Sequence, residues 1–363
     1  SSWSGIVDGR SSILFAVLAG VSIAIISGGT RPVDGLLLVQ ARLRILVRAV
    51  IVFAIGGVLA LLGTGIAIIL EVYAVLFVLS LPFLRWSPRR LFIAAGIVAI
   101  VGPVLRILLV AVVTWASSEL RPPVEMWSAL YDYATGMYPA VIWLAFLLLG
   151  LGVGRLVIEA LRVQLVLLAV GAGLAVVGYV LGALSAPLAF TVSDAGLGRM
   201  DRDPHALGPI VVQSSSALFG VLPHSGTTFE VVGSGGFAVA VIALCLLATR
   251  VRWLRVLLTP LASVGQMALT IYVAQVIAFW IIVIVIQRFP DDWGLFWCLA
   301  AVSLVLATIW RAFLGQGPLE RLLSAASRRA AAVPTALLES PVRPGEGATA
   351  PSSTSSEENT PHG

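Results

Sequence analysis

The chain has 363 residues, of which 59% are hydrophobic and only 11% are charged, and its mean hydropathy is +1.02. This composition excludes an ordinary water-soluble domain, in which about a quarter of the residues are charged, and indicates a chain that lies largely in lipid. The net charge of +5 does not predict a nucleic-acid partner, because all 23 basic residues are arginines and most lie between apolar segments.

Apolar segments of membrane-spanning length follow one another along the chain. A bilayer core about 30 Å thick needs roughly 20 apolar residues per helix. The segments number nine, and an odd number of spans would place the two ends of the chain on opposite sides of the membrane. We therefore expect one further N-terminal helix before residue 1. We therefore predict an all-α fold, a polytopic transmembrane helix bundle with spans at residues 11–29, 45–62, 66–84, 91–115, 138–154, 163–187, 231–249, 267–286 and 294–310.

The last part of the chain differs in composition. Residues 334–363 are rich in Pro, Ser, Thr, Gly and Glu and have few apolar side chains, which is typical of disordered segments. We predict a transmembrane domain over residues 1–330 and a disordered cytoplasmic tail over residues 334–363.

The breaks between the spans alternate in charge, and positively charged breaks usually stay in the cytoplasm. Breaks with more acidic residues are assigned to the outer side, although a minority of arginines, such as Arg10, lie there too. This pattern predicts a multi-pass protein of the cell membrane, in contact with membrane lipids and with a cytoplasmic C-terminus. The arginines assigned to the inner side are Arg31, Arg42, Arg44, Arg48, Arg85, Arg89, Arg90, Arg155, Arg162, Arg250, Arg252, Arg255, Arg311, Arg321, Arg328 and Arg329.

One arginine lies in the middle of a predicted span. Arg106 follows Pro103 by three residues within 91–115, and a charge at membrane depth is costly unless it has a function or a partner. One interpretation is that Arg106 faces a polar cavity and binds an anionic group. The other is a structural ion pair with Glu71 or Asp132.

The segment before the seventh span is suited to acid-base chemistry. The sequence PHSGTTFEVVGSGG contains His224, Ser225 and Glu230 beside two threonines. An imidazole changes protonation near neutral pH, so His224 is a candidate general base or acyl acceptor, with Glu230 expected to fix its tautomer. The alternative is a helix-entry loop whose hydroxyl groups cap the next helix. No CxxC or HExxH motif occurs, so no metal site is predicted.

Two further groups of polar residues lie at span ends or within spans. Asp8 and Arg10, in DGRSS, lie at the outer end of the first span, as substrate contacts or as an interfacial ion pair. Tyr272 and Gln275 lie within GQMALTIYVAQ, where Gln275 at membrane depth indicates a cavity wall or an interhelical hydrogen bond.

Four segments resemble a known family. GQMALTIYVAQ, followed by LGQGPLERLL, is similar to the C-terminal signature of YeiB-like bacterial membrane proteins. VDGRSSILFAVLAGVS resembles the early helix of that family, and LPHSGTTFEVVG resembles its pre-helix loop. The family is grouped with the transmembrane acyltransferases that include heparan-alpha-glucosaminide N-acetyltransferase. The opening SWSGIVDGRSS is similar to an SWNG segment of that enzyme, whose active-site histidine would here precede Ser1.

The resemblance implies an enzyme that moves an acyl group, such as acetyl, from cytoplasmic acyl-coenzyme A to a sugar or amine at the outer face. In that reading His224, Arg106 and Glu230 are catalytic, and Asp8, Arg10, Ser225, Tyr272 and Gln275 contact the substrate. Guanidinium groups bind phosphates by paired hydrogen bonds. The donor's phosphates would therefore be held at the inner face by Arg42, Arg44, Arg48, Arg89 and Arg90. The alternative is that these arginines only set the topology.

Two other functions agree with the same residues. A transporter or lipid-handling protein would use Arg106 and Gln275 to line a route through the membrane. A noncatalytic membrane scaffold with a regulatory tail is the third interpretation. The sequence leaves a homo-oligomer open.

Overall fold

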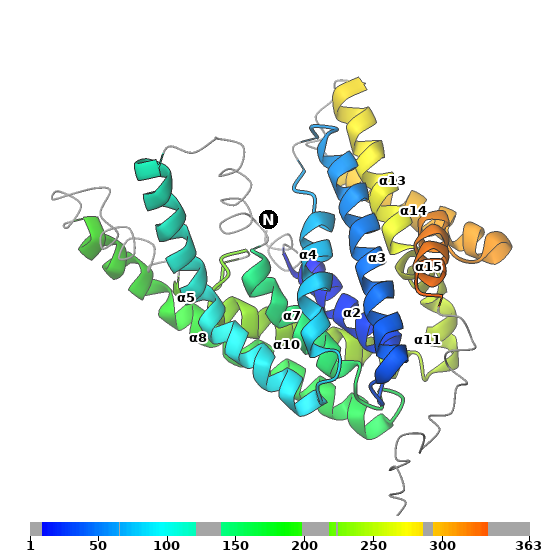
Figure 1. Cartoon of the computed structure of the whole chain (residues 1–363), viewed down its shortest axis with the longest axis horizontal. Helices are drawn as coiled ribbons and strands as arrows, with labels where there is room; N and C mark the ends of the chain where they lie inside the picture. The colour runs from blue at the N-terminus through cyan, green and yellow to red at the C-terminus, as the bar shows by residue number, and fades with distance from the viewer. Residues whose placement is uncertain are drawn as a thin grey trace, which may run out of the picture. The chain divides into compact units, whose positions relative to one another are not determined.

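The structure is a computed structural model that describes residues 9–64, 66–120, 139–197, 218–222, 224–285 and 293–332. In these parts every regular element is a helix and no strand occurs (Figure 1). The all-α prediction is therefore confirmed for them. Outside the described residues lie Asp8, Asp132 and the predicted tail at 334–363. His205, a second histidine before the seventh predicted span, in RMDRDPHALG, also lies outside them.

Every predicted apolar segment corresponds to one or more helices. In chain order the helices are α2 (Arg10–Ile26), α3 (Gly35–Ala60), α4 (Leu70–Ser80), η1 (Leu81–Phe83), α5 (Pro88–Leu120), α7 (Ala140–Val153), α8 (Leu161–Leu197), α10 (Thr228–Ala248), α11 (Arg252–Leu257), α12 (Thr259–Gln266), α13 (Ala268–Trp280), η3 (Ile281–Val285), α14 (Trp293–Leu314) and α15 (Pro318–Ala330).

The predicted number of nine spans is not confirmed. Among the described residues, five helices are long and apolar enough to cross a membrane, namely α3, α5, α8, α10 and α14. The pair α12 and α13 makes a sixth candidate if counted together, although it bends by 83°. The helices α2, α4 and α7 are apolar but shorter. For α7, 14 residues extend about 21 Å, less than the hydrocarbon thickness of about 30 Å.

Helix α7 is the centre of the bundle. Its residues are buried on every side, and it packs against α2, α4, α5 and α10. Glycine allows the backbones of α2 and α7 to touch: a Cβ atom on Gly150 would lie 1.9 Å from the carbonyl oxygen of Val17. Small residues at such contacts are typical of helix packing in membranes. Helix α7 is thus a core element enclosed by other helices.

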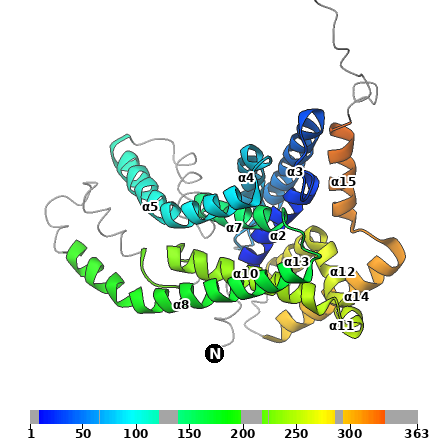
Figure 2. The same cartoon turned by 90° about the horizontal axis from the view of Figure 1, so that it is seen from below.

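Helices α8 and α10 form a second close pair, side by side in Figure 2. They run antiparallel, since Gly171 faces Ala240 whereas Gly182 faces Phe229. A Cβ on Gly178 would lie 2.4 Å from the nitrogen of Gly233, so this pair also depends on small residues. The contact fixes the start of α10, where the candidate site begins.

Several arginine-containing breaks gather at one end of the bundle, here called the basic end. Arg85 forms an ion pair of 2.9 Å with Asp34, the N-cap residue of α3. At the same end, after α10, Arg250 donates to the side chain of Gln164 at 2.6 Å. The alternating charge pattern therefore corresponds to helices threaded back and forth. Which compartment faces the basic end stays a prediction.

Arg155 has a structural role at the basic end beyond marking topology. It is 4% exposed, and its guanidinium donates to the carbonyl oxygens of Ala24, Ser27, Gly29 and Leu84 and to the hydroxyl of Ser27. Burial lowers the pKa of Arg155, but an arginine stays charged at neutral pH. Arg155 therefore joins the end of α2 to the segment before α5.

Candidate functional site

Three segments that are distant in sequence meet away from the basic end. They are the start of α2, the middle of α5 and the loop that enters α10. We call the residues Arg10, Arg106, His224, Ser225 and Glu230 the His224 cluster. Two of the four motif segments, VDGRSSILFAVLAGVS and LPHSGTTFEVVG, contribute to it, so the fold joins residues that the sequence separates by more than 200 positions.

The carboxylate of Glu230 binds backbone N–H groups of the loop that enters α10. Its Oε1 accepts the backbone N–H of His224 at 2.6 Å, and its Oε2 accepts the N–H of Gly226 at 2.6 Å and the hydroxyl of Ser225 at 3.2 Å. The side chain is 5% exposed. We expected Glu230 to fix the tautomer of the His224 ring. In the described contacts the Glu230 carboxylate binds the backbone N–H of His224 instead of its ring.

The loop has the local chemistry of a helix N-terminus. Thr227 is the N-cap residue of α10, and its hydroxyl oxygen accepts the N–H of Glu230 at 3.0 Å, as N-cap threonines commonly do. The same hydroxyl donates to the carbonyl of Gly220 at 2.8 Å. The predicted alternative, a helix-entry loop with capping hydroxyls, is present at Thr227. It coexists with the polar cluster.

His224 has an unusual backbone conformation. Its φ angle is +63°, in the left-handed backbone region that residues other than glycine rarely adopt. Such strain persists where surrounding contacts enforce it, often at functional sites. Here the enforcing contact is the hydrogen bond to Glu230.

The imidazole of His224 lies against the start of α2. A Cβ atom added to Gly9 would lie 3.1 Å from Nε2 of His224, and Gly9 itself has a φ of +74°. The missing side chain therefore makes room for the ring beside Arg10. A histidine and a glycine from separate motifs thus form one contact.

Arg106 reaches the same loop from α5. Its Nη1 donates to the carbonyl oxygen of Ser225 at 2.7 Å, and a Cβ on Gly226 would lie 3.1 Å from that nitrogen. Glu71, one of the two ion-pair partners considered, instead packs against Gly56 of α3. The described contact of Arg106 therefore runs to the His224 loop.

Arg10 lies over two aromatic rings. Its guanidinium carbon is 4.6 Å from the centroid of Tyr179 and 5.4 Å from that of Phe237, within the range of cation–π attraction. The hydroxyl of Tyr179 is 3.0 Å from that of Ser234. Sequence reasoning missed Tyr179, Ser234 and Phe237, because single aromatic and serine residues in apolar helices carry no distinctive pattern.

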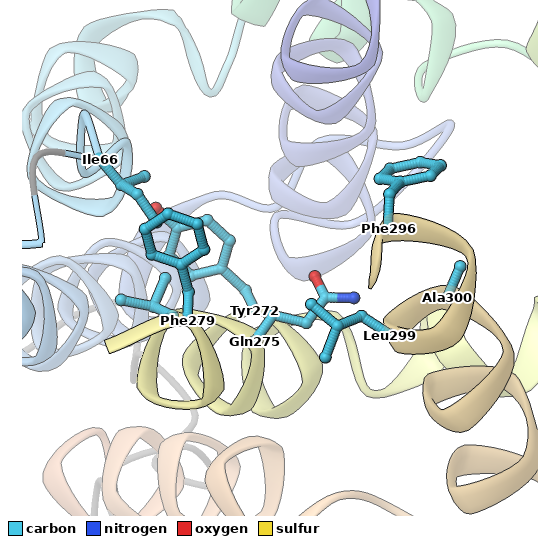
Figure 3. A pocket seen from close by; sticks show the side chains of 8 residues that line it. Ile66, Tyr272, Gln275, Phe279, Phe296, Leu299 and Ala300 are labelled. Atoms are coloured by element: carbon cyan, nitrogen blue, oxygen red, sulfur yellow. The ribbon is translucent and has the colours of Figure 1, made fainter. Parts of the chain in front are cut away.

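Tyr272 and Gln275 belong to a different site. They line a pocket of about 260 Å³ between α13, α14 and Ile66, with Phe279, Phe296 and Leu299 among the other lining residues (Figure 3). The Tyr272 hydroxyl accepts the N–H of Ile69 at 3.3 Å, and the Gln275 amide donates to Ser303 at 3.1 Å. The predicted interhelical hydrogen bond of Gln275 is therefore present, but the residues lining this pocket include none of the His224 cluster.

The five arginines assigned to donor phosphates are divided between two helices. Arg89 and Arg90 are exposed in the first turn of α5, and Arg42 is exposed on α3. Arg44 and Arg48, one helical turn apart, are half-buried on α3. The structure therefore brings Arg44 and Arg48 together, whereas Arg42, Arg89 and Arg90 are exposed.

The two C-terminal motifs contact each other directly. Glu320, in LGQGPLERLL, accepts the N–H of Thr270 at 3.0 Å and its hydroxyl at 2.5 Å. Thr270 lies in GQMALTIYVAQ, in the first turn of α13 just after the bend at Met267. The carboxylate therefore binds the free N-terminus of the second half of a bent helix pair, where negative charge is favourable.

Comparison with known proteins covers the C-terminal part of the chain. Residues 207–329 match the model of a family described as "Protein of unknown function (DUF418)", which includes YeiB-like membrane proteins. Three of the four motif segments lie in the matched region. Comparison with the curated proteins gave no match, and comparison with the solved structures gave none. The predicted similarity to YeiB-like membrane proteins therefore has support in this region.

Proposed function

We propose that the protein is a membrane acyltransferase whose active site is the His224 cluster. It would transfer an acetyl or other acyl group from acyl-coenzyme A to a sugar or amine acceptor. The observation that carries the proposal is the placement of an imidazole and two guanidinium groups, from three distant segments, in one cluster within an apolar helix bundle. Charged and titratable groups within a bundle of apolar helices are costly and usually functional.

The cluster contains the groups that acyl transfer needs. In the proposed reaction the acceptor hydroxyl or amine attacks the thioester carbonyl carbon, and its proton passes to His224 as general base. The carbon–sulfur bond then breaks, and His224 gives the proton to the departing coenzyme A thiolate, which leaves as the thiol. Arg106 would stabilise the oxyanion with its guanidinium. The Ser225 carbonyl, which already accepts from Arg106, would set the direction of that group.

The donor would enter from the basic end, which we assign to the cytoplasm together with the C-terminus. Arg89 and Arg90 are exposed there and free to meet phosphates. Arg106 lies 16 residues after Arg90 on α5, about 24 Å along the helix. The proposed donor phosphates would therefore lie at the start of α5 and the reacting carbonyl near the middle of the same helix. This arrangement suits a donor that reaches from the basic end into the bundle.

The test uses the full-length protein in lipid nanodiscs with radiolabelled acetyl-coenzyme A and a panel of amino sugars. Transfer should fall about a hundredfold or more in His224→Ala, the usual contribution of a general base. His205→Ala, which also removes a histidine, is the matched control and should retain transfer. Unchanged turnover in His224→Ala would move the base elsewhere, and the absence of any transfer by the wild-type protein with every acceptor would reject the proposal.

One observation favours a second function, lipid handling. The pocket beside Gln275 is lined mainly by apolar side chains with one amide and one phenol, a composition that suits an acyl chain with a polar group. Substitution of Ala300 by Phe should reduce binding of a fluorescent fatty acid while leaving acetyl transfer unchanged. Equal fatty-acid binding in the wild type and Ala300→Phe would reject lipid handling at this pocket.

A further inference from the structure

Two half-buried arginines share one side of α3. Arg44 and Arg48 are four residues apart, so their side chains lie on the same face of the helix. They flank the buried stripe of α3 that contains Ile45 and Ala49. The Nε atoms of both arginines are buried, and neither has a hydrogen-bond partner among the residues that the structure describes. Two cationic groups are thus held together without a described acceptor.

A third arginine adds to this positive charge. Helix α15 packs along α3, as Figure 2 shows, and the charges of Arg44 and Arg328 both act on the guanidinium of Arg48. Arg328 is exposed on α15. Like charges on neighbouring helices repel each other, and that repulsion is weakly screened where the groups are half-buried.

The carboxylates described near α3 have other partners or lie elsewhere along the helix. Asp34 is paired with Arg85, and Glu320 of α15 is bound to Thr270. Glu71 packs against Gly56, about 12 Å beyond Arg48 along α3. The described part of the chain therefore provides no counter-charge for the three arginines. An anionic ligand would provide both the charge and the missing acceptors.

We propose that Arg44, Arg48 and Arg328 form a phosphate-binding site between α3 and α15. A phosphate group has several acceptor oxygens and a negative charge, and guanidinium groups bind it by paired hydrogen bonds. The exposed side of Arg328 gives access, and the half-buried Arg44 and Arg48 form the inner wall. Two sources have this chemistry, the headgroup of an anionic lipid and the phosphates of a coenzyme A donor. The site does not depend on acyl transfer at His224.

The experiment measures phosphate binding directly, without reading any enzymatic activity. Full-length protein is tested in two arms: retention of phosphatidylglycerol by native mass spectrometry, and titration with coenzyme A by calorimetry. The variants are the double substitution Arg44→Gln with Arg48→Gln, and Arg328→Gln, which changes an exposed side chain and should not affect folding. Arg162→Gln is the matched control, because Arg162 is exposed on α8, which is not one of the two helices of the proposed site.

Binding in at least one arm should weaken about tenfold or more for each arginine removed, since a hydrogen bond to a charged group contributes that much. Arg162→Gln should bind as the wild type does. Loss in the lipid arm alone assigns the site to a headgroup, and loss in the coenzyme A arm alone assigns it to the donor. Wild-type binding by both the double variant and Arg328→Gln, or no binding by the wild type in either arm, would overturn the proposal.

Discussion

The backbone N–H of His224 and the Oε1 atom of Glu230 form a hydrogen bond of 2.6 Å. This contact holds a histidine at a φ of +63° at the entrance of α10. A backbone held in this way directs its side chain independently of the side chain's own hydrogen bonds. The loop therefore positions the imidazole and the Ser225 carbonyl together.

The first prediction separates the chemistry of His224 from the stability of its loop. Glycine adopts positive φ without strain, so His224→Gly should unfold at the same temperature as the wild type or a higher one. It should also lose acyl transfer, because the imidazole is gone. Thermal unfolding and the transfer assay, on the same preparation, check both parts. A clear drop in unfolding temperature would show that the ring itself stabilises the loop.

The second prediction concerns Glu230, whose carboxylate accepts three hydrogen bonds from the loop. In Glu230→Gln an amide NH₂ replaces one acceptor oxygen, so at least one buried N–H loses its partner. We expect a loss of about 1–3 kcal/mol in the free energy of unfolding. Denaturant unfolding measures the loss. Stability equal to that of the wild type would contradict the role of Glu230 as the holder of the loop.

The third prediction tests the contact between Gly9 and His224. A Cβ on Gly9 would lie 3.1 Å from Nε2, so Gly9→Ala should displace the ring and lower acyl transfer. Gly63→Ala is the matched control, because Gly63 also has a positive φ, +62°, but has nothing within 4 Å of an added Cβ. Both variants should show similar strain in unfolding measurements. Equal transfer in the two variants would mean that the His224 ring is not confined by Gly9.

The fourth prediction concerns Arg155, which binds the end of α2 and Leu84. A lysine keeps the charge but lacks the planar group with several donors. Arg155→Lys should therefore lower the free energy of unfolding by at least about 2 kcal/mol, through buried carbonyls left without donors. Arg162→Gln, at an exposed position of α8, should change little. Unchanged stability in Arg155→Lys would mean that the positive charge alone, without the several donors of the guanidinium, is enough to hold this contact.

The fifth prediction applies to the joined C-terminal motifs. Thr270 and Glu320 contact each other through two hydrogen bonds, so Thr270→Val and Glu320→Gln should not be additive in unfolding. A double-mutant cycle should give a coupling of about 0.5–3 kcal/mol, the range for residues in one network. Additive losses would show that the two motifs stabilise the fold separately.

The composition of the chain was sufficient to predict its helical class, because apolar segments of this length have few stable arrangements other than helices in lipid. The alternation of arginine and acid also predicted helices threaded back and forth. The contacts of Arg85 with Asp34 and of Arg250 with Gln164 agree with this prediction, because they gather arginine-containing breaks at one end. The number of spans was less predictable. Hydropathy gives α7 the same apolar signal as the longer helices, because α7 is apolar on every side. It did not show that α7 has only 14 residues and is enclosed by other helices.

The candidate residues followed the same division. Arg106, His224 and Glu230 could be chosen as candidate site residues from the sequence, because polar groups among apolar residues are conspicuous. Their contacts were not found, since hydrogen bonds to main-chain atoms leave no trace in a pattern of side chains. Only the tertiary structure placed Gly9 beside His224 and separated Tyr272 and Gln275 from them. The sequence by itself determined which groups are costly in lipid, and the packing of α2, α5 and α10 decided which of those groups meet, because helix contacts depend on side-chain shapes far apart in the chain.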